Sequence, residues 1–416
     1  MQETLLKILN FKQIKMLSYF LFFLGIFFGG RYAVNGIALF ILISLVGFFI
    51  YGTNRIVHFN RYLLIPVFFY ILHIISSFYS EHHKETIFDL EVKLSFIILP
   101  LIFGFEKIDL KINKHKILMV FAETALFSGL FLIIKGLYAF YITGVFPRYT
   151  DFSPFVHASY LTAYFTFNII VICFLYKNHQ NIFRKIILIS SLLISLSVIY
   201  FAESKAGFII LILVFIILVF RRLHKISKFW TYNIIILSLL IFANVLIKNQ
   251  RFMSMIQGYD TFKDVVNGKQ KYIESTAERL MTWDASIKLI KEHPWAGYGI
   301  GDTRNKLTEK YKELGYEKPA KLRLNAHNQY LETFLSLGIV GFISLLALLF
   351  IPAFFLKGDM SFLFKMFIFI FSLNFLFESM FNTQAGVIFF FFFYSFLISY
   401  NENRFLPPID SSEDMP

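Results

Sequence analysis

The chain has 416 residues, of which 57% are hydrophobic and 19% are aromatic, and 56 of them are phenylalanines. So many apolar side chains exclude an ordinary soluble domain with one compact core and indicate an integral membrane protein. The formal net charge is +13, but no RNA- or DNA-binding signature accompanies it, so we expect no nucleic-acid partner.

Apolar runs recur along the whole chain. Each has about 18 to 25 residues, enough to cross a hydrocarbon layer of about 30 Å as a helix. We predict an all-α polytopic fold with about twelve transmembrane helices. Their approximate centres lie at Phe23, Phe40, Tyr70, Ile98, Phe131, Phe167, Leu193, Leu213, Leu237, Leu345, Phe369 and Phe392. The first run lacks a small-residue cleavage site and is followed by further spans, so we expect it to be retained rather than cleaved as a signal.

Lysine and arginine are distributed unevenly between alternate connections. If the N-terminus is cytoplasmic, most of these residues outside the longest loop fall on inner segments. The short outer loops then carry only Arg31, Lys84, Arg148 and Lys205. This asymmetry is typical of the positive-inside rule and accounts for most of the excess charge.

The same topology divides the chain into four parts. Residues 1–247 are expected to form spans one to nine, and 248–328 a large, partly helical outer loop. Residues 329–400 are expected to form spans ten to twelve, and 401–416 a short cytoplasmic tail. A loop as long as the outer one is usually either functional or disordered.

Cys173 is the only cysteine and lies inside an apolar run. A single cysteine excludes an internal disulfide framework and a cysteine metal site. We therefore expect a buried core thiol.

The outer loop contains a strong helix signal. Ser275–Glu278 forms a capping box, and His293 with Pro294 marks the end of the helix. Between them Leu280, Trp283, Ile287 and Ile290 recur at helical spacing, which predicts an amphipathic helix against the membrane part and argues against disorder. Pro294–Asp302 follows as a glycine-rich turn; since no strand precedes it, a dinucleotide site is not expected.

The most informative segment is Asn325–Glu332, where the polar loop re-enters apolar sequence. It places the imidazole of His327 at the mouth of a transmembrane helix, where proton transfer can take place at a water-facing surface. One helix stripe is predicted, on which the glycines are packing contacts. The stripe consists of His327, Leu331, Phe334, Gly338 and Gly341.

These features together resemble the signature of the O-antigen ligase and polymerase family. The residues that carry the resemblance, across 275–345, are Arg279, Trp283, Ala285, Pro294, Gly297, Gly299, Gly301, His327, Asn328, Leu331, Gly338 and Gly341. Weaker matches lie at Phe155–Tyr160 and Glu203–Gly207, where Lys205 stands in place of the usual arginine. A lysine keeps the charge but loses the bidentate fork.

The resemblance implies a GT-C-like transferase in the bacterial inner membrane. Such enzymes move a glycan, with inversion, from a polyprenyl-diphosphate carrier to an acceptor hydroxyl on the outer, periplasmic face. The acceptor is a lipid A-core or similar lipid anchor for a ligase and a second carrier-linked chain for a polymerase. Ligase is our first expectation and polymerase the alternative. Neither a cofactor nor a divalent metal is expected, and membrane lipids surround the protein.

The resemblance also implies roles for particular residues. His327 is the expected general base, since the macrodipole of the following helix favours a neutral ring. Arg279 is expected to bind the diphosphate through paired hydrogen bonds, and Lys205 to add a point charge. The remaining candidates for substrate binding are Asn328, Glu378, Arg148 and His157. For Asn328 capping of the helix is an alternative role, and for Glu378 packing is.

A polytopic transporter is the alternative from a different class of function. Glu123 and Lys135 inside the fifth predicted span are compatible with it, because intramembrane charge often faces a cavity. However, we find no convincing internal repeat, and the polar groups collect on one outer face. This distribution favours chemistry at the surface over passage through it.

Overall fold

The computed structural model describes residues 2–50, 59–106, 112–178, 181–223, 258–265 and 275–401, together with positions 233 and 236. These residues form helices and no β-strand, which confirms the predicted all-α class. The predicted ninth-span centre, Leu237, lies outside the described residues, as do parts of the outer loop and the tail beyond residue 401.

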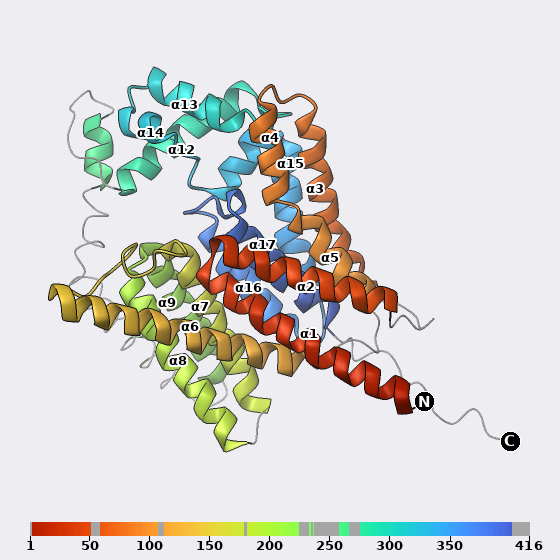
Figure 1. Cartoon of the computed structure of the whole chain (residues 1–416). Coiled ribbons are helices and arrows are strands. Elements are labelled where there is room, and N and C mark those ends of the chain that lie inside the picture. The colour runs from red at the N-terminus through yellow and green to blue at the C-terminus, as the bar shows by residue number, and fades with distance from the viewer. Residues whose placement is uncertain are drawn as a thin grey trace.

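The helices follow one another as Figure 1 shows. The first group comprises α1 (Gln2–Phe28), α2 (Gly30–Ile50), α3 (Leu64–Ser77), α4 (His83–Val92), α5 (Ser95–Phe105), α6 (Lys114–Thr143), α7 (Ala158–Asn178), α8 (Ile182–Ala202) and α9 (Lys205–Leu223). The second group comprises α12 (Ser275–Glu292), α13 (Thr303–Glu313), α14 (Glu317–Leu322), α15 (Gln329–Phe355), α16 (Ser361–Asn374) and α17 (Gln384–Ser399). Short 3-10 turns are η1 (Arg61–Leu63) and η3 (Met380–Asn382).

Within the described residues, 6 helices are long and apolar enough to cross a membrane. They lie at Asn10–Phe28, Gly30–Phe49, Lys114–Thr143, Ala158–Lys177, Ile182–Ala202 and Gln329–Phe355. Shorter apolar helices occur at Arg61–Ser77, Ser361–Asn374 and Gln384–Ser399. The chain is therefore a multi-pass membrane protein, but the predicted count of about twelve full spans is not reached by these helices. The predicted fourth span, centred at Ile98, is divided between α4 and the 11-residue α5.

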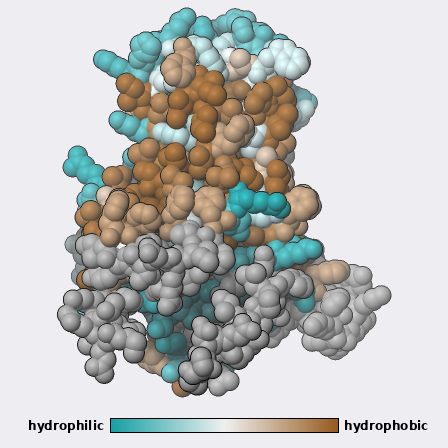
Figure 2. Space-filling view, turned by 90° about the vertical axis from the view of Figure 1, so that its right-hand side faces the viewer, coloured by the Kyte–Doolittle hydropathy of each residue, from teal (hydrophilic) through white to brown (hydrophobic). Residues whose placement is uncertain are grey.

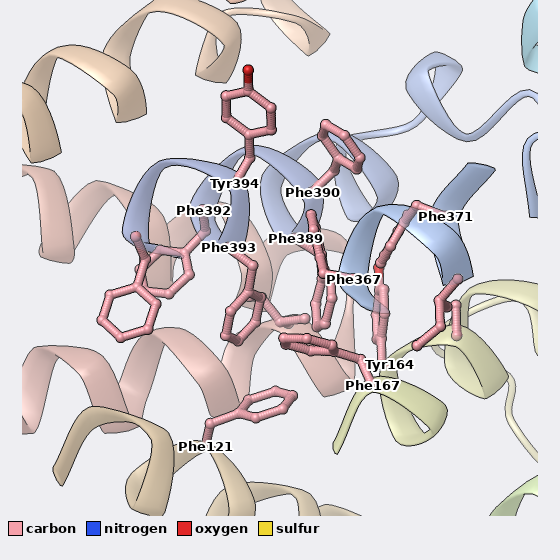
Figure 3. Close-up of a cluster of buried hydrophobic side chains, with 14 of the residues drawn as sticks. Phe121, Tyr164, Phe167, Phe367, Phe371, Phe389, Phe390, Phe392, Phe393 and Tyr394 are labelled. Atoms are coloured by element: carbon pink, nitrogen blue, oxygen red, sulfur yellow. The ribbon is translucent and has the colours of Figure 1, made fainter. Parts of the chain in front are cut away.

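The shortness of α17 is explained by its position in the core. Phe389 to Phe393 are fully buried, and a helix that is apolar on all sides is surrounded by protein rather than by water. In Figure 3 its phenylalanines meet aromatic rings from α6, α7 and α16. The rings of Tyr164 and Phe389 stack with centroids 4.0 Å apart, and those of Phe121 and Phe393 lie 4.8 Å apart. A helix enclosed in this way does not have to match the bilayer thickness by itself.

The outer surface of the bundle is apolar, as expected for contact with lipid. Figure 2 shows a broad hydrophobic band below a hydrophilic top. The apolar residues exposed on α3 include Leu64, Phe68, Ile71 and Ile75. Cys173 of α7 is also exposed, so the prediction of a buried thiol is wrong. A small apolar side chain is as well accommodated at a lipid-facing position as in the core, and hydropathy does not distinguish the two.

The polar helices α12, α13 and α14 lie together at one end of the molecule (Figure 1). They share a small hydrophobic core that includes Met281, Leu307, Tyr311 and Leu335 of α15. The described part of the outer loop is thus folded, as predicted, and α12 has the bounds that its capping box and Pro294 indicate.

The predicted apolar face of α12 is wrong at Ile287, whereas Ile290 does pack against the hydrophobic core of the polar helices. The residues buried on α12 are Ala277, Met281, Thr282, Ala285, Ser286 and Leu289, whereas Ile287 is 45% exposed. Small residues on this face permit close approach to α13 and α15, which hydrophobicity alone does not indicate. Leu280 and Trp283 line a cavity instead.

A backbone break divides α15 at Gly338, whose φ of 63° and ψ of −161° are not helical. The glycine-rich turn fills this break. Tyr298 N–H donates to Leu335 O at 2.7 Å, and Ile339 N–H donates to Pro294 O at 3.0 Å. The backbone groups freed by the break are therefore satisfied by the turn, as they must be at membrane depth. The single stripe predicted from His327 to Gly341 is wrong, because the helix begins at Gln329 and is interrupted.

Gly338→Ala is expected to destabilise the protein strongly. A Cβ at this position would lie 2.0 Å from Trp295 O, in a backbone conformation with positive φ. Gly315→Ala is the matched control, since Gly315 has a φ of 71° but nothing within 4 Å of its Cβ position. We expect a loss of at least about 3 kcal/mol at Gly338, against about 1–2 kcal/mol at Gly315. Thermal unfolding in detergent measures both, and equal losses would refute the account of the break.

Candidate active site

The backbone places His327 immediately before α15 and holds it on both sides. Asn328 is the N-cap, whose side chain accepts hydrogen bonds from the N–H groups of Tyr330 and Leu331. The Asn328 N–H donates to Ser379 Oγ at 3.1 Å, and the Ala326 N–H donates to Glu332 Oε2 at 2.8 Å. His327 itself has a φ of 46°, a left-handed conformation that costs about 1–2 kcal/mol for a non-glycine residue. The surrounding contacts therefore hold the backbone of His327 in a strained conformation.

The carboxylate of Glu378 joins the two predicted catalytic residues. Its Oε1 accepts from Arg279 Nη2 at 2.7 Å, and its Oε2 lies 3.3 Å from His327 Nδ1. Ser159 Oγ donates to Oε1 at 3.3 Å. Arg279 is further held by Nε, which donates to Phe377 O at 3.1 Å. Side chains of α12, α7 and the segment before α15 thus meet at one carboxylate in the connection between α16 and η3.

Glu378 remains ionised despite its burial. Its residue is 6% exposed, and burial raises the pKa of a carboxyl group. The hydrogen bond from His327 and the positive charges of Arg279 and His157 outweigh burial and lower the pKa to about 2. A lowered folded-state pKa contributes stability that is present above the ordinary value of 4.5 and is lost as the pH falls toward 2. The carboxylate is therefore charged throughout the neutral range.

A cavity of about 240 Å³ opens beside this cluster. Its lining includes Tyr149, Lys205, Thr276, Arg279, Trp283 and Phe377. Lys205 Nζ donates to Thr276 Oγ1 at 3.1 Å, so the first turn of α9 faces the first turn of α12 across the cavity. Arg279 and Lys205 both belong to the described lining of this cavity, whereas His327 does not. His327 contacts Oε2 of Glu378 and Arg279 contacts Oε1, so the two side chains lie on different oxygens of one carboxylate.

The other predicted site residues lie around this cluster. Arg148 Nη1 forms an ion pair of 2.7 Å with Glu203, which lines the cavity. His157 Nε2 lies 3.4 Å from the hydroxyl of Tyr149, another lining residue. Arg148 and His157 are therefore not among the described lining residues, but each contacts a residue that lines the cavity. The side chain of Asn328 caps α15 and donates to Leu376 O at 3.2 Å, which supports the capping role left open by the sequence.

Several residues that contact the Glu378 cluster or the cavity are not indicated by the sequence. Ser159 and Glu203 lie inside the two weaker family matches, in which the resemblance points to His157 and Lys205 instead. Thr276 belongs to the capping box of α12, a motif that predicts a helix start and no contact with a distant residue such as Lys205. No three His, Cys, Asp or Glu side chains gather to hold a metal ion anywhere in the searched, described part of the chain.

Comparison with known proteins gives one family match. Residues 190–346 match the family model described as O-Antigen ligase. This segment runs from α8 into α15 and contains Lys205, Arg279, His327 and Asn328; Arg148, His157 and Glu378 lie outside it. Over this segment the match agrees with the family resemblance inferred from the motifs.

A relative from Haemophilus influenzae (strain ATCC 51907 / DSM 11121 / KW20 / Rd), described as an uncharacterized protein, is 33% identical over 97 residues. These residues are 22% of this chain and 24% of that protein. The chain thus matches less than two thirds of the length of this relative.

Proposed function

We propose that this chain, which matches the O-antigen ligase family over residues 190–346, transfers a glycan from a polyprenyl-diphosphate carrier to an acceptor hydroxyl. The observation that carries the proposal is the Glu378 carboxylate, which holds a histidine on one oxygen and an arginine on the other. An arginine suits the leaving diphosphate, and a histidine suits the proton of the attacking hydroxyl.

The cavity beside α9 and α12 is proposed as the diphosphate site. Arg279 binds Phe377 O through Nε and Glu378 through Nη2, so among the described residues its Nη1 has no hydrogen-bond partner. The side chain is 22% exposed, and this nitrogen is available to a phosphate oxygen. Lys205 on the opposite wall supplies a second positive charge. Trp283 and Phe377 supply apolar surface beside the two cations.

The acceptor is proposed to approach from the side of His327. In the transfer step the acceptor oxygen forms a bond to the anomeric carbon, and the bond from that carbon to the diphosphate oxygen breaks. The hydroxyl proton passes to His327 Nε2, and the negative charge that develops on the diphosphate is stabilised by Arg279 and Lys205. Attack opposite the leaving group inverts the anomeric centre. The step needs no cofactor, and we propose that it needs no divalent metal.

The site is proposed to face the periplasm from the inner membrane. The polar helices α12–α14 lie at one end of the described structure, and the uneven distribution of lysine and arginine favours an outer position for that end. In a Cys173→Ser background, Lys288→Cys on α12 should react with a maleimide that cannot cross the inner membrane, whereas Ile182→Cys at the start of α8 should not. Both side chains are well exposed, with fractions of 44% and 71%. The reverse labelling pattern would refute this orientation.

We favour a ligase that uses a lipid-anchored acceptor, with a polymerase as the alternative. The two share the donor site and differ in the acceptor. Deletion of the gene in its host distinguishes them through the surface glycan. A ligase is indicated if long chains disappear from the lipid anchor while carrier-linked polymer is still made. A polymerase is indicated if the anchor carries single repeats.

A further inference from the structure

The carboxylate of Glu378 has a role that neither the sequence nor the family match assigns. It is almost completely buried and lies between a cation and an imidazole that come from different elements. Both of its oxygens are engaged, Oε1 by Arg279 and Ser159 and Oε2 by His327. A carboxylate occupied in this way is poorly placed to bind an acceptor directly.

The contact with His327 determines where the imidazole proton lies. An ionised carboxylate can only accept hydrogen bonds. The hydrogen shared by Glu378 Oε2 and His327 Nδ1, 3.3 Å apart, must therefore be carried by Nδ1. A neutral imidazole has one N–H, so its other nitrogen, Nε2, keeps a lone pair. No described residue occupies this Nε2.

We propose that Glu378 is a positioning residue that holds His327 in the Nδ1–H tautomer and directs Nε2 toward the acceptor hydroxyl. This inference rests on the proposed function of the site. When Nε2 takes the hydroxyl proton, the ring becomes an imidazolium with a hydrogen on each nitrogen, and the Nδ1–H stays with Glu378. The adjacent carboxylate stabilises this positive charge as it develops, as in a nucleophile–histidine–carboxylate arrangement.

The same carboxylate orients the guanidinium of Arg279. Nη2 bonds to Glu378 and Nε to the carbonyl of the preceding residue, Phe377. Two contacts to adjacent residues fix the plane of the guanidinium and direct it at the cavity. The connection between α16 and η3 thereby orients both His327, the proposed base, and Arg279, the proposed diphosphate-binding cation.

Glu378→Gln separates this role from a structural one. A glutamine side chain has only one acceptor oxygen, which can face either His327 or Arg279. Its NH2 group then faces the remaining partner, with which it can form no hydrogen bond as an acceptor. Glu378→Asp keeps the charge at a greater distance and should restore part of the function. Glu106→Gln is the matched control, because Glu106 is a buried carboxylate that also binds a cation, Lys15, and a hydroxyl, that of Tyr400.

The first measurement is the tautomer of His327 in the full-length protein without substrate. Histidine labelled with ¹⁵N reports which ring nitrogen carries hydrogen, and the signal of His327 is identified by its loss in His327→Ala. We expect the Nδ1–H form in the wild type and in Glu106→Gln, and a shift toward the Nε2–H form in Glu378→Gln. An unchanged tautomer in Glu378→Gln would overturn the inference.

The second measurement is kcat with a polyprenyl-diphosphate-linked glycan as donor. Glu378→Gln should lower kcat by about 100-fold or more, with partial recovery in Glu378→Asp. A kcat within about threefold of the wild type would overturn the inference even if the tautomer changes. A wild-type protein that transfers no glycan would contradict the proposed function instead, and the tautomer measurement distinguishes that failure because it uses no substrate.

Discussion

His327→Ala is expected to lower the rate of glycan transfer by about 10²- to 10⁴-fold, the usual contribution of a positioned general base. The backbone of His327 is held in a left-handed conformation before α15, and Nδ1 of its imidazole lies 3.3 Å from Glu378 Oε2. Alanine removes the base without disturbing the Asn328 cap, so the protein should still accumulate and bind its donor. Transfer is measured with purified protein in nanodiscs, and donor binding by titration with the carrier-linked glycan.

Two control variants distinguish loss of the base in His327→Ala from a general effect of removing a histidine or weakening the start of α15. His83→Ala removes an exposed histidine of α4 and should leave kcat unchanged. Asn328→Ala removes the N-cap of α15, which is worth about 1 kcal/mol of stability, and should be milder than loss of the base. A folded His327→Ala protein that retains wild-type turnover would exclude His327 as the base.

Arg279→Ala is expected to cost at least about 2 kcal/mol of transition-state stabilisation, about a 30-fold loss in kcat/KM for the donor. The guanidinium lines the cavity and is directed there by Phe377 and Glu378. Arg279→Lys keeps the charge without the planar fork, so we expect partial activity. The assay compares kcat/KM for the carrier-linked donor between variants.

The effect must be distinguished from loss of a surface charge. Arg304 of α13 is exposed and donates to the carbonyl of Arg323. Arg304→Ala therefore removes one arginine from the same group of polar helices without touching the cavity, and its kcat/KM should match the wild type. If Arg279→Ala and Arg304→Ala behave alike, diphosphate binding by Arg279 is refuted.

Local chemistry made part of the structure predictable. The capping box at Ser275 and the proline at 294 mark the bounds of α12, because both act on the backbone within one helical turn. His327 next to the N-cap of α15 follows from the same kind of signal. The glycine-rich turn is also predictable, since closely spaced glycines after a proline disfavour regular structure.

Contacts between distant segments were not predictable. Glu378 lies 99 residues from Arg279 and 51 residues from His327 in the sequence, and only the packing of α16 against its neighbours brings them together. A glycine within an apolar helical pattern, such as Gly338, is compatible with close packing or with a break. The turn that begins at Pro294 stabilises the break through its hydrogen bonds to α15, and it lies more than forty residues away in the sequence.

Helix length was a poor guide to position. The sequence pattern shows only that α17 is apolar, and an apolar helix can lie inside the bundle, as α17 does, or face lipid. A central helix and a lipid-facing span therefore have the same composition but different lengths. The same ambiguity explains why Cys173 was expected inside and is exposed on α7.

The central claim is that this protein transfers a glycan from a diphosphate carrier with its own side chains. The direct test reconstitutes the purified chain in liposomes with a polyprenyl-diphosphate-linked glycan and a lipid-anchored acceptor, in excess chelator. Mass spectrometry follows both products. We predict that glycosylated acceptor and free polyprenyl diphosphate appear in equal amounts with the wild type and not with His327→Ala. Passage of the intact carrier-linked glycan across the bilayer, with neither product formed, would contradict the account and indicate a transporter.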